Sequence, residues 1–201
     1  PVRKLVQGVS RKADTSKAGQ FWDETLDIYR PKMEVAIIGL RRSRSLFDEK
    51  SLDAPPLCTS DDAVRPREQV EIDGQMTGPT CEVCPYAEWG SGKAGKGQAC
   101  QFSYTLLCCD LEGFEMFILR ISGVSIGAWK QYLTKGNRQG TPAYAVRTLI
   151  GSQQRTFQHG VAHVLTFESG GVLSDNDIIE FMREKAARFQ GIPIEKSPEE
   201  E

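Results

Sequence analysis

The sequence predicts a mainly β fold with flanking helices, and three features indicate this class. The stretch 33–40 is apolar and rich in β-branched residues, which is typical of a buried strand. Two regions, 101–123 and 143–168, each contain two strand-like runs separated by a turn signal, which is typical of antiparallel hairpins. Helical patterns occupy 125–136 and 174–189. At 201 residues, the chain has the length of one domain with an insertion and tails.

Residues 1–31 are predicted to form an N-terminal arm followed by a helix. The first 20 residues contain few large apolar side chains, which is typical of a mobile arm. In the following "AGQFWDETLDIYR", Phe21, Leu26 and Tyr29 lie near helical spacing. The strand at 33–40 then continues into "RRSRSLF", which we expect to bring three arginines and Phe47 to the surface.

The middle of the chain alternates loops and short strands. Residues 49–66 are loop-like, and "EQVEID" before Gly74 is a short strand candidate. The first hairpin is expected to turn at Glu112 and Gly113. The helix after it is expected to end at Gly136.

The C-terminal half is predicted to contain a second hairpin and a last helix. The hairpin joins "AYAVRTLI" to "VAHVLTFE" with a turn near His159 and Gly160. The helix "SDNDIIEFMREKAARF" has Ser174 as its expected N-cap and acidic residues in its first turn.

This order of elements favours one particular β architecture. Five or six short antiparallel strands, with a helix between the third and fourth, suit a small Greek-key barrel of the OB type, although other α+β sheets remain open. We therefore expect an OB-type domain over 32–170, a C-terminal helix over 171–190 and an acidic tail over 191–201.

The formal net charge of −2 hides a segregation along the chain. Residues 1–50 and 91–147 are each +4, whereas 51–90 carry 2 basic and 8 acidic residues and 168–201 carry 4 and 9. Such blocks are also compatible with simple solvated faces. No apolar run approaches the length of a membrane span, and the first residues lack the apolar centre of a secretory signal, so we expect a cytoplasmic protein without a membrane segment.

The six cysteines fall into two groups. Cys81 and Cys84 form a Cys-x-x-Cys pair, fifteen residues separate Cys84 from Cys100, and twenty-two separate Cys58 from Cys81. Four thiolates satisfy tetrahedral Zn²⁺ and leave no position for water or substrate, so the spacing predicts a structural zinc site within a loop at about 56–101. A [4Fe–4S] cluster, which also takes four thiolates, and ordinary free or buried thiols remain the alternatives.

The other cysteines and the histidines are assigned no metal role. Cys108 and Cys109 are adjacent in an apolar run, so core packing is their expected role. His159 and His163 lie four apart in a turn and strand, where they would be roughly 13 Å apart and unable to share an ion. With only two histidines and no obvious carboxylate cluster, the sequence predicts a protein that is not an enzyme.

The loop "GSGKAGKG" at 90–97 resembles a nucleotide-binding loop but does not complete its pattern. Gly97 stands where such a loop needs the Ser or Thr that binds Mg²⁺, and a Cys pair precedes the loop instead of a buried strand. The loop therefore predicts flexible backbone with lysines that can contact phosphates, and not an NTPase.

Basic and aromatic residues near this loop indicate binding of single-stranded nucleic acid, since aromatic rings stack on bases while cations hold phosphates. The alternative is that the aromatic residues belong to the core and the arginines are merely solvated. The candidate contact residues are Arg41, Arg42, Arg44, Phe47, Trp89, Lys93, Lys96, Phe102 and Tyr104.

The segments "CEVCPYAEWGSGKAGKGQAC", "SYTLLCCDL" and "LRISGVSIGAWKQYL" resemble a group of phage- and mobile-element-encoded proteins that are similar to single-stranded DNA-binding proteins. The similarity covers about residues 32–170. It implies an OB-type barrel interrupted by a zinc-binding loop. It also implies that Cys81, Cys84 and Cys100 are metal ligands, with Cys58 as the matching upstream ligand.

Together these observations predict a zinc-stabilised protein that coats single-stranded DNA without sequence preference during phage or mobile-element replication or recombination, in the cytoplasm of a bacterial host. The acidic tail is expected to compete for the basic groove or to recruit a polymerase, helicase or recombinase. The alternative is an interaction or scaffold module that recruits such enzymes through this tail without gripping DNA.

Overall fold

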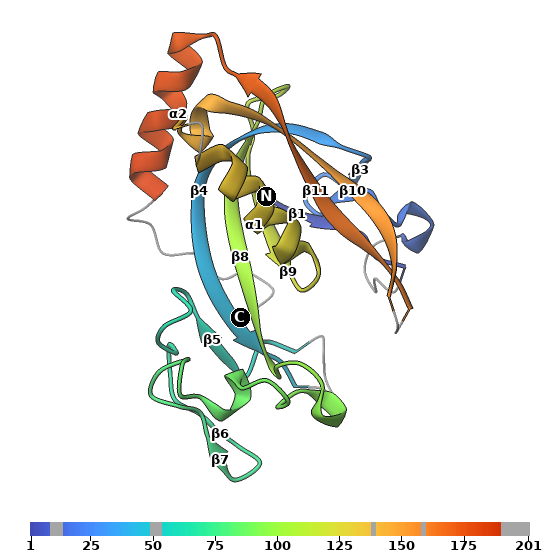
Figure 1. Ribbon diagram of the computed structural model, residues 1–201, viewed down its shortest axis with the longest axis vertical. Helices are drawn as coiled ribbons and strands as arrows, with labels where there is room; N and C mark the ends of the chain where they lie inside the picture. Colours follow the sequence, from blue (N-terminus) through green and yellow to red (C-terminus); the bar gives the residue numbers. More distant parts are fainter. Residues whose placement is uncertain (9–13, 49–53, 138–139, 158–159, 190–201) are drawn as a thin grey trace. The chain divides into compact units, whose positions relative to one another are not determined.

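The computed structural model describes residues 1–8, 14–48, 54–137, 140–157 and 160–189. This part of the chain is mainly β, with two α-helices (Figure 1). The predicted fold class, mainly β with flanking helices, is therefore confirmed.

Within the described residues, the α-helices are α1 (Ser125–Asn137) and α2 (Asn176–Phe189). The strands are β1 (Val2–Leu5), β2 (Phe21–Asp23), β3 (Ile28–Arg30), β4 (Met33–Leu46), β5 (Cys58–Ser60), β6 (Glu71–Ile72), β7 (Gln75–Met76), β8 (Cys100–Asp110), β9 (Met116–Ser122), β10 (Val146–Phe157) and β11 (Gly160–Val172). Four single-turn 3-10 helices lie at Thr15–Lys17, Pro85–Ala87, Lys93–Gly95 and Ala143–Ala145.

Most strands belong to one sheet with the order β11-β10-β4-β8-β9-β1-β2-β3, and β5 pairs with β4 outside this path. The strands β8 and β9 are neighbours, and β10 pairs antiparallel with β11 from Val146 opposite Val172 to Phe157 opposite Gly160. Both predicted hairpins are therefore present, while the tip of the second one at 158–159 lies outside the described residues. The short strand expected before Gly74 is β6, which pairs only with β7.

The chain divides into two compact units. Unit 1 contains Pro1–Leu40 and Thr105–Gly191. Unit 2 contains Arg41–Tyr104, and the predicted acidic tail at 191–201 lies outside the described residues. The strands β4 and β8 contribute residues to both units.

The core of unit 1 is apolar and includes the fully buried Leu106, Leu119 and Ile121. The amphipathic helix α2 packs Met182 against a cluster that contains Ala36, Ile38, Cys109 and Leu173. Gly39 makes room for the end of this helix, since a Cβ at this position would collide with the buried ring of Phe189. Small residues on β4 thus allow α2 to lie close to the sheet.

The N-terminal region differs from the prediction. The segment expected to form a helix forms the β2–β3 hairpin, with Trp22 opposite Tyr29. The Asp23 carboxylate accepts hydrogen bonds from the backbone N–H groups of Thr25 and Leu26, and Asp27 adopts a left-handed φ of 52°. The Asp23 bonds could also start a helix, but the left-handed backbone at Asp27 reverses the chain instead of continuing a right-handed helix. The helix prediction for this segment is wrong.

The arm prediction also fails for the described residues 1–8. The strand β1 pairs antiparallel with β2 and parallel with β9. Arg3 is only 2% exposed, and its guanidinium donates to Asp23 (3.1 Å), Asp110 (2.6 Å) and Glu115 (3.2 Å) while it lies over the ring of Phe117. A buried arginine with paired carboxylates fixes this strand in place.

The start of α2 also differs from the prediction. The Asp175 carboxylate accepts from the backbone N–H groups of Asp177 and Ile178, which is the bonding of an N-cap. Asp175, and not the predicted Ser174, therefore caps this helix.

Candidate metal and nucleic-acid site

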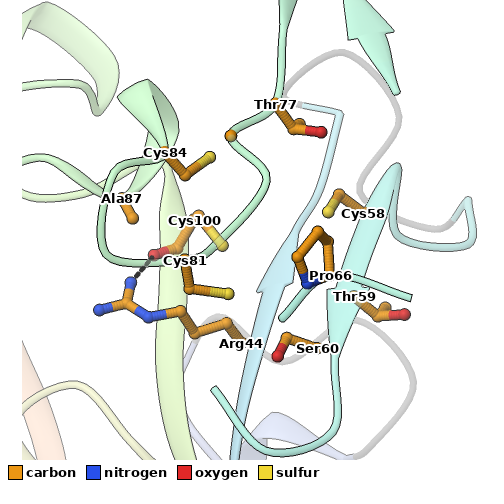
Figure 2. A pocket seen from close by; sticks show the side chains of 11 residues that line it. Arg44, Cys58, Thr59, Ser60, Pro66, Thr77, Cys81, Cys84, Ala87 and Cys100 are labelled. Carbon is orange, nitrogen blue, oxygen red and sulfur yellow. Dashed lines mark hydrogen bonds between the residues drawn. The ribbon is translucent and has the colours of Figure 1, made fainter. Parts of the chain in front are cut away.

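Four cysteines from separate parts of unit 2 line one cavity. Cys58 begins β5, Cys81 and Cys84 flank a tight turn before the 3-10 helix Pro85–Ala87, and Cys100 begins β8. Figure 2 shows their four sulfur atoms directed into the same space. Cys81, Cys84 and Cys100 are buried, whereas Cys58 is partly exposed. The fold thus brings together the four cysteines that the spacing selected.

Local backbone contacts position these cysteines. The register of β4 and β5 places Leu46 opposite Cys58, and the N–H of Cys81 donates to the carbonyl of Val64. A Cβ at Gly78 would lie 2.7 Å from the Cα of Cys84, so only glycine allows this close approach. Leu46, Cys84, Ala87 and Cys100 then form a small buried cluster around the site.

The cavity has a volume of about 10 Å³, which is roughly the room for one water-sized body. Among the described residues, no three Cys, His, Asp or Glu side chains are gathered closely enough to form a metal-binding group as they stand. Four soft sulfurs are the ligands that Zn²⁺ and iron–sulfur clusters both take, but a space for one water-sized body suits a single ion better than a cluster of several atoms.

Burial favours the protonated form of two of these thiols, those of Cys58 and Cys100. Burial raises the pKa of Cys100 to about 11; the Arg44 charge lowers this pKa by a smaller amount, and Cys58, Cys81 and Cys84 raise it further. Burial likewise raises the pKa of Cys58, and Cys84 and Cys81 add to the rise. A bound divalent cation would reverse this effect, because it stabilises thiolates directly.

The loop that follows the Cys-x-x-Cys pair is closed on itself. The N–H groups of Gly90 and Gly92 both donate to the carbonyl of Gly97, and Gly90 and Gly97 have left-handed φ angles of 98° and 67°. The Ser91 hydroxyl donates to the Glu88 carbonyl and accepts from the Ala99 N–H. Because these N–H groups are used within the loop, they do not form a phosphate cradle, in agreement with the sequence pattern.

This closed loop carries the most exposed large hydrophobic residue among those described. Trp89 is 84% exposed, and the side chains of Lys93 and Lys96 are also exposed. The loop that bears them is fixed by the hydrogen bonds of Ser91 and by that of the Gln98 amide to the Ala87 carbonyl. Trp89 is therefore presented to solvent from an ordered support.

The remaining predicted contact residues differ in their exposure. Arg42 is exposed, Arg41 and Phe47 are half-buried, and Arg44 lines the cysteine cavity. Phe102 is half-buried and makes an edge contact with Tyr104 at 5.0 Å between ring centroids. Tyr104 is 8% exposed, so its ring packs inside and offers no open face for stacking. All nine predicted residues lie in unit 2.

Cys108 and Cys109 are both 0% exposed, which confirms their predicted role in core packing. Burial raises the pKa of both thiols, in the case of Cys109 to about 11. His163 bonds through its backbone to the side-chain amide of Gln7, and His159 lies outside the described residues. His163 is not among the described residues that line the cysteine cavity.

Sequence reasoning missed the residues that support this site. The Ser43 and Ser103 hydroxyls, both buried, bond to each other at 2.8 Å beside the arginines of β4. Ser91 and Gln98 brace the loop, and the Tyr86 hydroxyl donates to the Ile72 carbonyl. Only the alternation of Ser43 and Ser45 with arginines along one strand could have signalled such a pair.

No helix among the described residues has the length and apolar character required to cross a membrane. Searches for similarity found no matching family model, no matching curated protein and no matching solved structure.

Proposed function

We propose that this protein binds single-stranded DNA through unit 2, on a surface centred on Trp89, and that a structural zinc ion held by Cys58, Cys81, Cys84 and Cys100 orders that unit. By the sequence resemblance, such a protein acts in phage or mobile-element replication or recombination, inside a bacterial cell. Binding would be largely independent of sequence and sensitive to salt, because phosphate contacts release counterions.

The order of the strands supports an OB-type assignment. In β11-β10-β4-β8-β9, the first long strand, β4, lies between the next long strand of the chain, β8, and the later strand β10. The helix α1 follows β9 and precedes β10, which is the position expected between the third and fourth strands of the barrel.

The four cysteines support the zinc ion. They come from β5, the Cys-x-x-Cys turn and β8, so one ion would cross-link three segments that also meet in a small apolar cluster. With four protein thiolates the ion supplies structure and no catalysis, because no coordination position is left for a substrate.

The observation that carries the proposal is the exposure of Trp89. A large aromatic side chain that is 84% exposed on a loop fixed by hydrogen bonds contributes nothing to the core and offers its ring for stacking on a base. Lys93 and Lys96 are exposed on the same loop and supply the phosphate contacts that accompany base stacking. Arg42, Phe47 and Phe102 complete the proposed surface.

The test is a fluorescence titration with oligothymidylate at low salt. Trp22 and Trp129 are 9% and 1% exposed, so quenching by the oligonucleotide would report mainly on Trp89. We expect Trp89→Ala to remove the quenching and to weaken binding, measured by anisotropy of a labelled oligonucleotide, by about 1–3 kcal/mol. Phe114→Ala, a change of an exposed aromatic in unit 1, is the control and should change neither. Absence of binding at low salt would refute the proposal.

A second function, an interaction module, is favoured by a different part of unit 2. Val64, Met76 and Val83 are each more than half exposed in the segment that carries most of the acidic residues of this unit. Acidic surface repels DNA and suits a basic protein partner, and the acidic tail adds further negative charge to the chain. Retention of a replication or recombination enzyme by a protein with no affinity for DNA would favour this function.

A further inference from the structure

Arg44 has different surroundings from Arg41 and Arg42, the other arginines on β4. Arg44 lies opposite Ser60 of β5, and the register with β5 extends over residues 44–46 only. Its guanidinium donates to the Cys100 carbonyl at 3.2 Å and lies 5.6 Å from the centre of the Phe102 ring. The side chain is therefore held on two sides, as Figure 2 shows for the bond to Cys100.

The cavity that Arg44 lines has a particular electrostatic requirement. Four thiolates and one Zn²⁺ together carry a net charge of −2, and a net charge that is largely removed from water is costly unless it is paired. Among the described residues that line the cavity, Arg44 alone bears a formal charge at neutral pH, because its other lining residues are Thr, Ser, Pro, Gly, Ala and the cysteines.

We propose that Arg44 is the charge partner of the four-cysteine metal centre and not a phosphate contact. This inference rests on the proposed function, in particular on its zinc ion. Arg44 acts as a positioning residue: its guanidinium fixes the backbone at Cys100 and offsets the negative charge of the thiolates. Arg42, two residues earlier on the same strand and exposed, remains a phosphate contact.

The experiment measures metal affinity and DNA binding in the same variants of the full chain. Co²⁺ replaces zinc, so that its sulfur charge-transfer absorption reports four-thiolate binding, and competition with a chelator gives the affinity. We expect Arg44→Gln to weaken Co²⁺ binding about 10- to 100-fold, as removal of residues that support metal ligands does. Arg44→Lys restores the charge and should recover most of this loss.

Arg42→Gln is the matched control on the same strand. It should leave the Co²⁺ affinity unchanged and reduce the slope of log affinity for oligothymidylate against log salt by about 1. Arg44→Gln should leave that slope unchanged, measured with saturating metal.

The outcomes separate the inference from the proposed function. If the unaltered protein takes up Co²⁺ with sulfur charge-transfer bands but Arg44→Gln and Arg44→Lys bind it equally well, the role of Arg44 is refuted and the zinc proposal stands. A salt slope lowered by Arg44→Gln with unchanged metal affinity would make Arg44 a phosphate contact. Failure of the unaltered protein to bind Co²⁺ would overturn both proposals. If Arg44→Gln does not fold, the result for Arg44→Lys decides. Retained Co²⁺ affinity with an unchanged salt slope supports the inference, and a loss of Co²⁺ affinity refutes it.

Discussion

The two units of this protein are stabilised by different means. Unit 1 combines long paired strands with fully buried Leu, Ile and Phe side chains and a buried ion network around Arg3. Unit 2 has short strands apart from its parts of β4 and β8, and two of the four buried members of its apolar cluster are Cys84 and Cys100. Small units that cannot bury enough apolar surface need covalent or metal cross-links. The cysteines of unit 2 are therefore the proposed cross-link of that unit, whereas Cys108 and Cys109 fill the core of unit 1.

The largest expected effect comes from removing one proposed metal ligand. Cys81→Ser should unfold unit 2 and leave unit 1 folded, because a structural zinc ion contributes apparent binding energies of about 10–16 kcal/mol that a small apolar cluster cannot replace. Hydrogen exchange followed by mass spectrometry should show protection lost over 58–100 and kept in unit 1. Cys109→Ser is the control: it should destabilise unit 1 and leave the zinc content unchanged. If unit 2 kept the same protection in Cys81→Ser as in Cys109→Ser, its stability would not depend on the proposed metal site.

A smaller effect is expected from the ion network of unit 1. Asp110→Asn leaves the buried Arg3 with weaker partners and should cost about 3–5 kcal/mol of unfolding free energy, measured with urea. Burial alone would raise the pKa of Asp110, but hydrogen bonds from Arg3 and the Glu112 N–H, with the charges of Arg3 and Arg30, hold it below its ordinary value of 3.8.

The same carboxylate predicts an acid dependence. Because its pKa is lower in the folded protein, ionised Asp110 contributes stability that is complete well above pH 3.8 and is lost as the pH falls below 3.8 through the folded pKa. Asp110→Asn should lose less stability over that interval. If Asp110→Asn lost as much stability at acid pH as the unaltered protein does, other carboxylates would be responsible for that loss.

Packing of α2 offers a third test of unit 1. Gly39→Ala places a methyl group against the Phe189 ring and should lower stability by about 1–3 kcal/mol through displacement of the helix end. Gly127→Ala is the matched control, since a Cβ at this position on α1 would meet no atom within 4 Å apart from its chain neighbours and the nearby backbone of its own helix, and it should raise stability by about 0.5–1 kcal/mol. In thermal unfolding, the midpoint should fall for Gly39→Ala and rise for Gly127→Ala. Equal midpoints in the two variants would show that the close contact of Phe189 with position 39 does not determine stability.

The smallest effect concerns DNA binding alone. Lys93→Gln should leave stability unchanged and lower the salt slope of oligothymidylate binding by about 1. Lys130→Gln, at an exposed position on α1 of unit 1, should change neither quantity. Equal changes in both variants would show that the charge effect is not confined to unit 2.

The parts of the fold that were predictable depend on local patterns. The apolar run of β4, the helix α1 and the two hairpins follow from residues close in sequence. The β1–β3 region was not predictable, because β1 is fixed by Arg3 with Asp110, 107 residues away, and by pairing with β9. Three-residue strands such as β2 also have too few residues to establish a period.

The four candidate metal ligands could be predicted from the sequence, whereas the exposure of the nearby aromatic residues could not. Spacing selected Cys58, Cys81, Cys84 and Cys100, and the fold gathers them, while the metal itself stays a prediction. Alternation along β8 placed Phe102 and Tyr104 on one face, but which ring is covered depends on tertiary packing that the pattern does not contain.

The contact of Gln7 with β11 has a consequence for solubility. The side-chain amide of Gln7 donates to the carbonyl of His163 and accepts from its N–H, as a neighbouring strand would. The next outward-facing N–H, that of Leu165, bonds to the Ser125 hydroxyl. Since β11 is the last strand in the described sheet order, these two side chains occupy an edge that would otherwise pair with strands of other molecules. Loss of Gln7 would therefore appear first as self-association at high protein concentration, before any loss of folding.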